Sequence, residues 1–443
     1  MHTHPHPADS ADNPRTPSQD APLGLAIVGL GGAVATTAVA GSLLIREGLQ
    51  DTVGLPLAEF GGLDLTRYDR LHFAGWDLYQ EDLYRAAVHH QVLSRDQLAA
   101  VEAELSEMTP WPALANRNFC AGVTNGADST ETLRDQVATV QRQLRDFAEA
   151  IGGNVVVINL ASTEHALDAA TPAYQTPEAF EAALDACDAA ISPGMVYAYA
   201  AITAGVPYGN FTPTAAADIP ALRQLALELG VPVAGKDGKT GQTFVKTVIA
   251  PALRARALHV DGWFSTNILG NRDGEALRKP GSLANKINTK GDVLGSCLGY
   301  PVEDHVVKIN YYRPRGDAKE AWDNVDLVGF LGEKMQLKIN FLCKDSILAA
   351  PLALDIARCL DLAGRRGRGG VAEPMGVFFK GPMTADPEAV PEHDFARQQA
   401  AFLDWLRGLN SEGGASGEGA SGEGASGAGS AVAPAPEASR AAA

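Results

Sequence analysis

The chain has 443 residues, of which 46% are hydrophobic and 20% are charged. This composition excludes a disordered protein, and the length is sufficient for two or more domains with sizeable cores. The 36 Lys and Arg residues face 53 Asp and Glu residues, which gives a formal net charge of −17. Nucleic acids and anionic membranes both attract basic surfaces, so this charge argues against either as a partner.

Five cysteines are widely spaced and include no C-x-x-C pair: Cys120, Cys187, Cys297, Cys343 and Cys359. An odd number without paired spacing predicts free thiols in a reducing compartment, so we expect a cytoplasmic protein. We expect neither a disulfide framework nor a zinc site, and no bound metal. The N-terminus lacks a basic segment followed by an apolar one, so we expect no signal peptide.

Both ends of the chain are predicted to be disordered tails. Residues 1–22 combine Pro, Asp and Ser with almost no large apolar side chain, and residues 411–443 repeat a Gly-Ala-Ser-Gly-Glu unit. Neither segment can bury enough apolar surface to become ordered. The alternating His2, His4 and His6 could bind a metal, but a solvated N-terminus is the favoured interpretation.

Residues 23–45 contain no charged residue, and the segment is long enough to cross a bilayer. Three glycines follow the aliphatic run 25–28, and a membrane span does not account for them. A buried parallel strand, a glycine turn and a helix of small residues over 33–47 account for all three features. We therefore predict a strand, a turn and a helix here.

The glycine turn is a candidate dinucleotide site. Backbone N–H groups at a helix start, with no Cβ in the way, can approach a pyrophosphate and stabilise its charge. The pattern is G-x-G-G-x-x-A, with Ala35 in place of a third glycine, and a tight turn without a ligand would look the same. Asp77, after a predicted strand over 70–74, is a candidate ribose partner, and its alternative role is a helix N-cap.

The middle of the chain continues the α/β pattern. Helical spacing over 129–151 precedes the near-continuous β-branched run 154–160, which predicts a central parallel strand, and a further helix is predicted over 176–189. Ser162 and Thr163 directly follow the strand, where open α/β sheets bind ligands. The two hydroxyls are candidate cofactor contacts, and helix capping is an equally weighted alternative.

Residues 235–243, with the sequence GKDGKTGQT, offer backbone amides, hydroxyls and lysines to an anion. A predicted helix over 244–257 follows, so the loop lies at a helix N-terminus, where a phosphate is favoured. From the residues alone, a phosphate site and a solvated turn are equally weighted. Lys286 and Lys290 would share one face of a helix, either as a solvated basic face or as a pair directed at a phosphate or an oxyanion.

Taken together, these blocks resemble the inositol-3-phosphate synthase family, also called the myo-inositol-1-phosphate synthases. The resemblance covers roughly residues 23–405 and is strongest over 234–352. The matching motifs are GLGG at 29–32, GWD at 75–77, TE at 163–164, KDGKTGQT at 236–243, LGNRDG at 269–274, K-x-x-x-K at 286–290, GDAK at 316–319 and DSILAAP at 345–351. The chain departs from the family with Ala35 for Gly, Thr240 for Ser and Arg272 for Asn.

The resemblance implies an α/β fold, in which a Rossmann-like NAD-binding domain contains an inserted β-rich α+β domain for catalysis and oligomerisation. The NAD-binding domain would cover 23–245 and resume over 353–410, and the inserted domain would cover 246–352. Members of the family are usually homotetramers, so we expect a homotetramer.

The implied reaction is an isomerisation that returns its NAD unchanged. D-Glucose 6-phosphate would be oxidised at C5, enolised, closed by an intramolecular aldol step between C6 and C1, and reduced to 1D-myo-inositol 3-phosphate. The ketone, enolate and alkoxide place negative charge on oxygen, which preorganised ammonium groups stabilise. Clustered and desolvated lysines are expected to have lowered pKa values, which would suit proton transfer near neutral pH.

The resemblance also implies a role for individual residues. Lys286 and Lys380 would polarise carbonyl oxygens and move protons, while Lys290 and Lys319 would hold the phosphate. The implied catalytic residues are Lys286, Lys290, Lys319, Lys380, Asp345 and Asp237. The implied substrate-binding residues are Thr240, Gly241, Gln242, Thr243 and Asn271. The implied cofactor contacts are Gly29, Leu30, Gly31, Gly32, Ala33, Asp77, Ser162, Thr163 and Asp273.

Two other functions stay open. One is a Rossmann-type oxidoreductase that acts on a related sugar phosphate with net release of NADH. The other is a catalytically silent regulator that binds a sugar phosphate or NAD, and lysines at all four implied positions weigh against it. Arg272 would bring bulk and charge close to the nicotinamide and the sugar, which keeps a related sugar phosphate open as the substrate.

Overall fold

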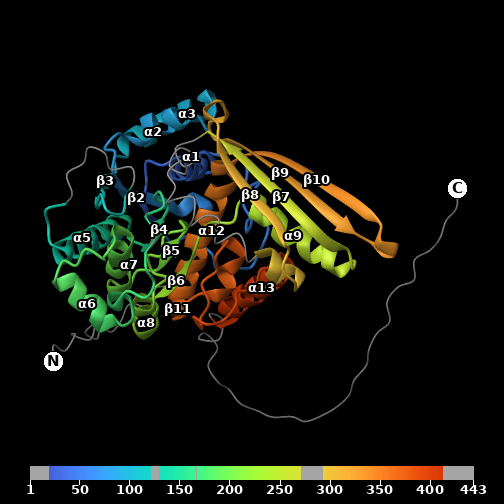
Figure 1. The fold of residues 1–443 in the computed structure, drawn as a ribbon. Coiled ribbons are helices and arrows are strands. Elements are labelled where there is room, and N and C mark those ends of the chain that lie inside the picture. The colour runs from blue at the N-terminus through green and yellow to red at the C-terminus, as the bar shows by residue number, and fades with distance from the viewer. Residues whose placement is uncertain (1–18, 121–128, 166, 271–292, 413–443) are drawn as a thin grey trace, which may run out of the picture.

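The computed structural model describes residues 19–120, 129–165, 167–270 and 293–412 (Figure 1). Most of each predicted tail lies outside the described residues. So do five residues within the matched motifs, namely Asn271, Arg272, Asp273, Lys286 and Lys290.

Seven parallel strands form the larger sheet, in the order β11-β6-β5-β4-β1-β2-β3. Their bounds are Leu23–Val28 (β1), Leu71–Asp77 (β2), Trp111–Pro112 (β3), Asn154–Asn159 (β4), Tyr208–Asn210 (β5), Pro232–Gly235 (β6) and Gly370–Val371 (β11). From β3 to β6 this is the doubly wound order of dinucleotide-binding folds. The order reverses between β1 and β4, so the ligand crevice is expected at the carboxyl ends of these two strands.

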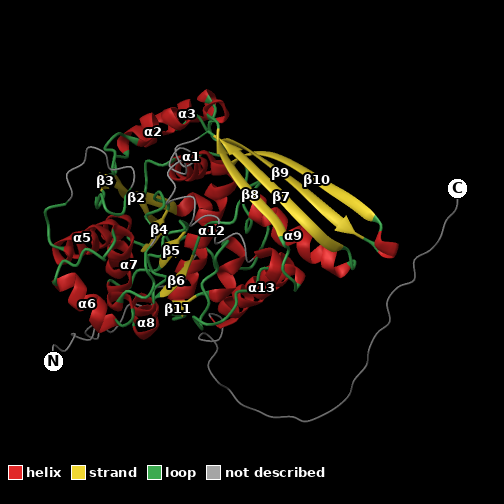
Figure 2. Cartoon of the chain, in the orientation of Figure 1, coloured by secondary structure: helices red, strands yellow, loops and turns green. Residues whose placement is uncertain are grey.

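Helices cover both faces of this sheet (Figure 2). One face packs against α1 (Ala33–Arg46), α12 (Asp345–Arg365) and α13 (Phe395–Glu412), and the other against α5 (Leu133–Ile151), α6 (Pro177–Asp185), α7 (Pro193–Thr203) and α8 (Pro220–Glu228). On α5, Val137, Val140 and Leu144 are buried at helical spacing, which gives that helix one apolar face. By contrast, α7 is buried along nearly its whole length.

Short elements complete this part of the chain. A lobe of three helices, α2 (Leu83–His90), α3 (Arg95–Ala99) and α4 (Glu102–Glu107), lies beside α1 (Figure 1). The 3-10 turns are Tyr68–Arg70, Pro172–Tyr174, Arg313–Arg315, Phe330–Gly332 and Glu373–Phe378. The predicted strand–turn–helix reading of 23–45 is confirmed by β1 and α1, and no described helix is long and apolar enough to span a membrane.

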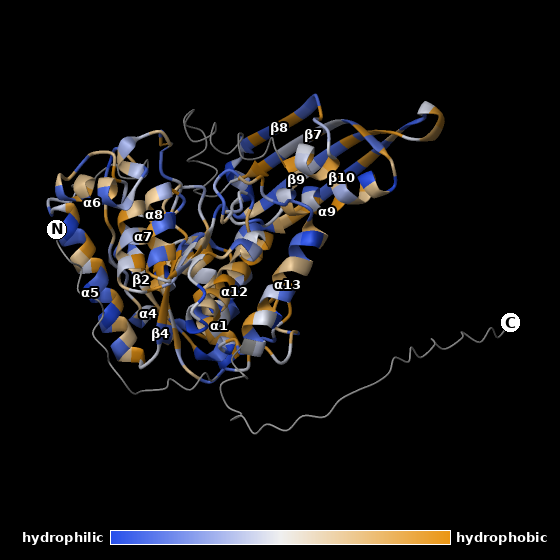
Figure 3. Ribbon diagram, turned by 90° about the horizontal axis from the view of Figure 1, so that it is seen from below, coloured by the Kyte–Doolittle hydropathy of each residue, from blue (hydrophilic) through white to orange (hydrophobic). Residues whose placement is uncertain are grey.

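A second sheet has four strands in the order β10-β9-β7-β8 and extends away from the first (Figure 1). Its strands are His259–Leu269 (β7), Asp304–Tyr311 (β8), Ala318–Val328 (β9) and Lys334–Lys344 (β10). Hydrophobic and hydrophilic residues alternate along them (Figure 3), because one face packs on α9 (Gln242–Ala255) around Trp263 and Val325. The predicted α/β fold with a β-rich second part is thereby confirmed.

A buried ion pair anchors the middle of α12. Asp355 accepts a hydrogen bond from the Arg358 guanidinium at 2.7 Å and another from the Tyr68 hydroxyl at 2.7 Å, and neither charged residue is more than 5% exposed. The Leu57 N–H donates to the same carboxylate at 3.0 Å. Three segments of the chain therefore meet at one carboxylate.

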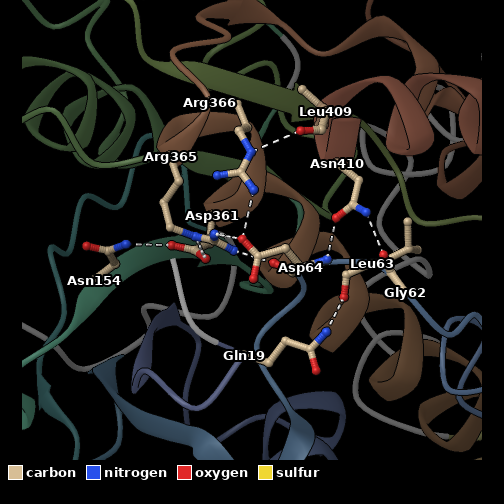
Figure 4. Close-up of polar contacts among 10 residues, drawn as sticks. All are labelled: Gln19, Gly62, Leu63, Asp64, Asn154, Asp361, Arg365, Arg366, Leu409 and Asn410. Carbon is tan, nitrogen blue, oxygen red and sulfur yellow. Dashed lines mark hydrogen bonds and ion pairs between the residues drawn. The ribbon is translucent and has the colours of Figure 1, made fainter. Parts of the chain in front are cut away.

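A second polar cluster holds the C-terminal end of α12 (Figure 4). The guanidinium of Arg365 donates to Asp361 at 2.8 Å and to Asp64 at 2.7 Å. Arg366 also donates to Asp64, at 2.8 Å, and the side chain of Asn410 on α13 accepts the Asp64 N–H. These basic residues lie in the last turn of the helix, where its dipole favours positive charge.

The described chain includes a few residues at the edges of both predicted tails. Gln19 donates from its side chain to the Leu63 carbonyl at 2.6 Å, and its own carbonyl accepts the Arg67 N–H at 3.0 Å. Helix α13 continues to Glu412. Hydrogen bonds thus begin before the first strand, and helix continues past residue 411.

We predict that Asp355→Ala lowers the free energy of unfolding by about 3–5 kcal/mol, because it leaves a buried guanidinium without a carboxylate. Urea unfolding measures the change. Asp404→Ala on α13 is the matched control, since Asp404 and Arg407 have the same i,i+3 spacing but are mostly exposed. The control should change stability by less than about 1 kcal/mol. Equal losses in the two variants would show that the buried pair is not the anchor.

Candidate active site

The turn between β1 and α1 uses its own N–H groups to hold its shape. Within residues 29–32, two N–H groups donate to the Trp76 carbonyl, the third donates to the Asp77 carboxylate at 2.9 Å, and the fourth donates to the Gly29 carbonyl. Asp77 ends β2 and also accepts the Tyr79 N–H, whereas the N-cap of α2 is Asp82. The alternative role of Asp77 as a helix N-cap is therefore wrong.

Glycine is required in this turn by close approach of the backbone. Gly29 has φ +89°, and a Cβ there would lie 3.0 Å from the backbone of Ala161. Gly75, with φ +155°, passes so close to β1 that a Cβ would lie 2.0 Å from the Ile27 carbonyl oxygen. The two glycines let β1, β2 and the loop after β4 come together around a narrow cradle.

The N–H groups that this cradle offers to a ligand are those of Ala33, Val34 and Ala35. They form the first turn of α1, where a helix supplies no partners, and no hydrogen bond of the described residues involves them. The N-cap residue is Gly32, which has no side chain to cap these N–H groups, and the first turn contains no acidic residue. A helix start of this kind fits the diphosphate of a dinucleotide.

His90 also contacts this turn, although nothing in the sequence predicts this contact. Its Nε2 lies 2.7 Å from the Gly31 carbonyl oxygen, so the lobe of α2 is tied to the nucleotide cradle. The two adjacent histidines that end α2 give no sequence signal for such a contact, because the contact spans 59 positions of the chain.

One cavity at the carboxyl edge of the larger sheet gathers most of the predicted site residues that the structure describes. Residues that follow β4 and one residue of α1, Val34, form its nucleotide side. Neither Ser162 nor Thr163 is the N-cap of a described helix. The lining includes Val34, Ser162, Thr163, Asp237, Thr240, Gly241, Gln242, Thr243, Asn267, Lys319, Asp345 and Lys380. Elements of both sheets therefore meet at one place.

The described lysines of the cavity each face a carboxylate. Lys380 donates to Asp237 at 2.7 Å, while the Lys319 ammonium lies 3.4 Å from one oxygen of Asp345. Burial is the largest single effect and would lower the pKa of Lys319, but the charge and hydrogen bond of Asp345, together with nearby Cys343 and Asp237, raise that pKa above its ordinary value. The lowered pKa expected for clustered lysines is thus wrong for Lys319, because its neighbour is an acid.

Two buried oxygen atoms in the cavity lining have no hydrogen-bond partner among the described residues. They are Oδ2 of Asp237 and Oδ1 of Asn267, in residues that are 4% and 1% exposed. Buried acceptors without donors are unfavourable, so both oxygens fit the hydroxyl groups of a ligand. Asn267 lies within β7 and was missed by the sequence analysis, because alternation predicts only that it faces inward.

The side chain of Gln242 is occupied within the protein. Its Nε2 donates to Asp323 at 2.8 Å, and its Oε1 accepts from Asn267 at 2.5 Å. The groups that α9 offers to a ligand are therefore backbone N–H groups, those of Gln242 and Thr243 at the start of the helix. The N-cap residue, Gly241, has no side chain to occupy them. This geometry fits a phosphate better than a solvated turn.

Two buried lysines lie outside the cavity lining. Lys239 donates to Gln398 at 2.5 Å, and its burial lowers its pKa to about 7. Lys246 lies 2.8 Å from the Nε2 of His305, and burial lowers its pKa to about 8. The sequence motif contains Lys239, but the structure turns this side chain toward α13.

Lys239 should make stability depend on pH. Between pH 7 and pH 10 the unfolded chain keeps a proton that the folded protein has released, so folding becomes more favourable as pH rises. Relative to Lys239→Met, the wild-type protein should gain about 1 kcal/mol per pH unit over this range, measured by urea unfolding. Lys338→Met, at an exposed position of β10, should leave the pH dependence unchanged. Parallel pH profiles for wild type and Lys239→Met would contradict the assignment.

The chain is similar to known inositol phosphate synthases over most of its length. The profile of the myo-inositol-1-phosphate synthase family matches residues 53–407. Inositol-3-phosphate synthase 1 of Bacteroides thetaiotaomicron is 39% identical over 413 residues, which make up 88% of this chain and 96% of that protein. The inositol-3-phosphate synthase of Spirodela polyrhiza is 30% identical over 77% of this chain and 75% of its own.

Solved structures share the fold. The inositol-3-phosphate synthase of Caenorhabditis elegans has a TM-score of 0.81 at 22% identity, over 88% of this chain and 86% of its own. A myo-inositol-1-phosphate synthase-related protein from Thermotoga maritima has a TM-score of 0.73 at 23% identity, over 87% of this chain and 98% of its own. The family match and the identity to the Bacteroides enzyme together show that this chain belongs to the myo-inositol-1-phosphate synthase family.

Proposed function

We propose that this protein converts D-glucose 6-phosphate into 1D-myo-inositol 3-phosphate, with NAD as a cofactor that is returned unchanged. The observation that carries the proposal is the shared cavity, which is lined by Ser162 and Thr163 on the nucleotide side, by the loop 240–243 and by Lys319 and Lys380. A nucleotide beside a phosphate loop and paired lysines suits a reaction that combines hydride transfer with oxyanion chemistry.

The phosphate of the substrate is assigned to the start of α9. The N–H groups of Gln242 and Thr243 and the dipole of the helix favour a dianion there. Lys319 supports the same assignment, because its contact with Asp345 is long at 3.4 Å and leaves ammonium donors for a phosphate oxygen. By resemblance, Lys290 would add a second ammonium group.

Lys380 and Asp237 are assigned to the reacting carbons. Lys380 donates one of its three N–H bonds to Asp237, so two remain for a carbonyl or enolate oxygen. The second oxygen of Asp237 can accept a sugar hydroxyl. By resemblance, Lys286 would stabilise the oxyanions of enolisation and ring closure, and Asn271 would bind the sugar.

The cradle after β1 is assigned to NAD, which supplies the capacity to take a hydride from the substrate and return it. The N–H groups of residues 33–35 would hold the diphosphate, and Asp77 would lie on the ribose side. Ser162 and Thr163 would contact the end of the cofactor that faces the sugar, and Asp273 by resemblance the nicotinamide side.

We propose the cytoplasm as the compartment and keep the predicted domain division. All five cysteines are free thiols, which suits a reducing environment. The proposed boundaries at 245 and 352 lie within α9 and α12, so both helices would pass between the NAD-binding domain and the inserted domain.

A direct test supplies the enzyme with a small amount of NAD and an excess of glucose 6-phosphate. We expect more equivalents of inositol phosphate than of NAD by NMR, with no steady rise in NADH absorbance, because each cycle regenerates the cofactor. Stoichiometric NADH without a cyclitol would favour the oxidoreductase, and no reaction of either kind would favour the silent regulator.

Two variants refine that test. Lys380→Ala should lower kcat about 10²–10³-fold, the scale for losing one preorganised donor to an oxyanion. Lys236→Ala is the matched control, since Lys236 also pairs with an aspartate, Asp218 at 2.6 Å, but does not line the cavity. The control should keep nearly full turnover, because Asp218 retains its ion pair with Arg223. Equal loss in both variants would contradict the role of Lys380.

We further propose that the protein forms a homotetramer through the open face of the four-stranded sheet. Large apolar side chains that share this face by register are 39–60% exposed, namely Phe264, Val306, Trp322 and Leu342. Several exposed large apolar side chains on one open sheet face are typical of a protein interface.

Light scattering should therefore give the mass of four copies of the 46.4 kDa chain. Trp322→Asp should reduce this mass, because a charge in place of an apolar side chain on this face opposes burial. Leu227→Asp is the control, since Leu227 is 68% exposed on α8, which packs on the larger sheet and not on the four-stranded one. A monomeric wild type, or a tetramer unaffected by Trp322→Asp, would rule out this interface.

A further inference from the structure

Asp317 belongs to the GDAK motif, but the family resemblance implies no role for it. Its carboxylate is buried, with 8% of the residue exposed, and it does not line the cavity. One oxygen accepts from the Ser346 hydroxyl at 2.9 Å, and the other accepts the Ser346 N–H at 3.2 Å. The Asp317 carbonyl also accepts the Asp345 N–H at 3.4 Å.

These contacts cap α12 from outside the helix. Lys344 at the N-cap position makes no side-chain cap bond, and its ammonium instead donates to the Val92 carbonyl. Most helices take the cap from the residue that precedes them. Here a carboxylate 29 positions earlier in the chain supplies the acceptor.

Asp317 thereby connects the two members of one ion pair. Lys319 follows it by two positions at the start of β9, and Asp345 immediately precedes Ser346. Strands β9 and β10 are in register at this point, with Lys319 opposite Cys343. The Asp345 carboxylate accepts from the Thr240 hydroxyl at 2.9 Å and lies 3.4 Å from the Lys319 ammonium.

We propose that Asp317 is a positioning residue that keeps the Asp345 carboxylate directed at Lys319 and Thr240. This inference rests on the proposed function, in which that pair binds the substrate. The N–H groups of the first helical turn attract any nearby carboxylate. Asp317 occupies two of them, the N–H groups of Asp345 and Ser346, so Asp345 is not drawn back to cap its own helix and stays on the cavity side.

The test is a double-mutant cycle on kcat/KM for inositol phosphate formation. Asp317→Asn keeps the size of the side chain but removes its charge, and we expect about a tenfold loss, since small misplacement of a site residue is costly. In an Asp345→Asn background, Asp317→Asn should add less than about a threefold loss, because its effect passes through Asp345. The inference would be overturned if the loss in the double variant equals the product of the two single losses, or if Asp317→Asn keeps full activity.

Thr176→Ala is the matched control for a lost helix cap. Thr176 caps α6 by accepting the Ala179 N–H at 3.2 Å, and α6 lies on the other side of the larger sheet. This variant should lower the melting temperature while leaving kcat/KM unchanged in both backgrounds. A comparable kinetic loss would mean that general loosening, and not positioning, explains Asp317→Asn.

A crystal structure of Asp317→Asn tests the geometry without any assumption about activity. We expect the Asp345 carboxylate to turn toward the Ser346 N–H and to lose its contacts with Thr240 and Lys319. Ser346→Ala removes one of the two Asp317 bonds and serves if Asp317→Asn does not fold. Unchanged contacts of Asp345 would overturn the inference. If the Asp345 carboxylate turns in the variant but the wild-type protein forms no cyclitol, the positioning role of Asp317 stands and the proposed function is rejected.

Discussion

Helix α12 is the element on which the geometry of the cavity depends. Its first residue, Asp345, lines the cavity, its middle is anchored by the buried Asp355 pair, and its last turn is held by the cluster around Asp64. An α-helix rises 1.5 Å per residue, so this rigid element of 21 residues spans about 30 Å beneath the sheet. The positions of the second sheet and of the nucleotide side are thereby set by one helix.

Electrostatics separate the lysines of the cavity from the other buried lysines. Lys319 and Lys380 each lie beside a carboxylate, and the pKa of Lys319 is raised above its ordinary value despite its burial. Lys239 and Lys246 have no carboxylate within ion-pair distance among the described residues, and burial lowers their pKa values. A count of lysines in motifs cannot distinguish these two kinds, because the distinction depends on which acid the fold places beside each one.

Local patterns were sufficient to predict the elements that frame the nucleotide site. The aliphatic run before the glycines became β1, and the β-branched run over 154–160 became β4, because periodicity and turn residues act over a few positions. The sequence did not reveal His90 or Asn267, whose roles come from partners far along the chain. It also gave no sign that the side chain of Gln242 is held inside the protein.

The alanine in the glycine-rich turn has a consequence for how such proteins are recognised. The donors available to a diphosphate come from the first turn of α1, while the glycines serve to shape the backbone around them. Ala35 contributes its N–H to that turn, and its methyl group is completely buried in the core. Replacement of the third glycine by alanine therefore preserves the anion-binding donors and adds apolar contact. A search pattern that demands three glycines would overlook sites of this kind, whereas a pattern built on the backbone donors would retain them.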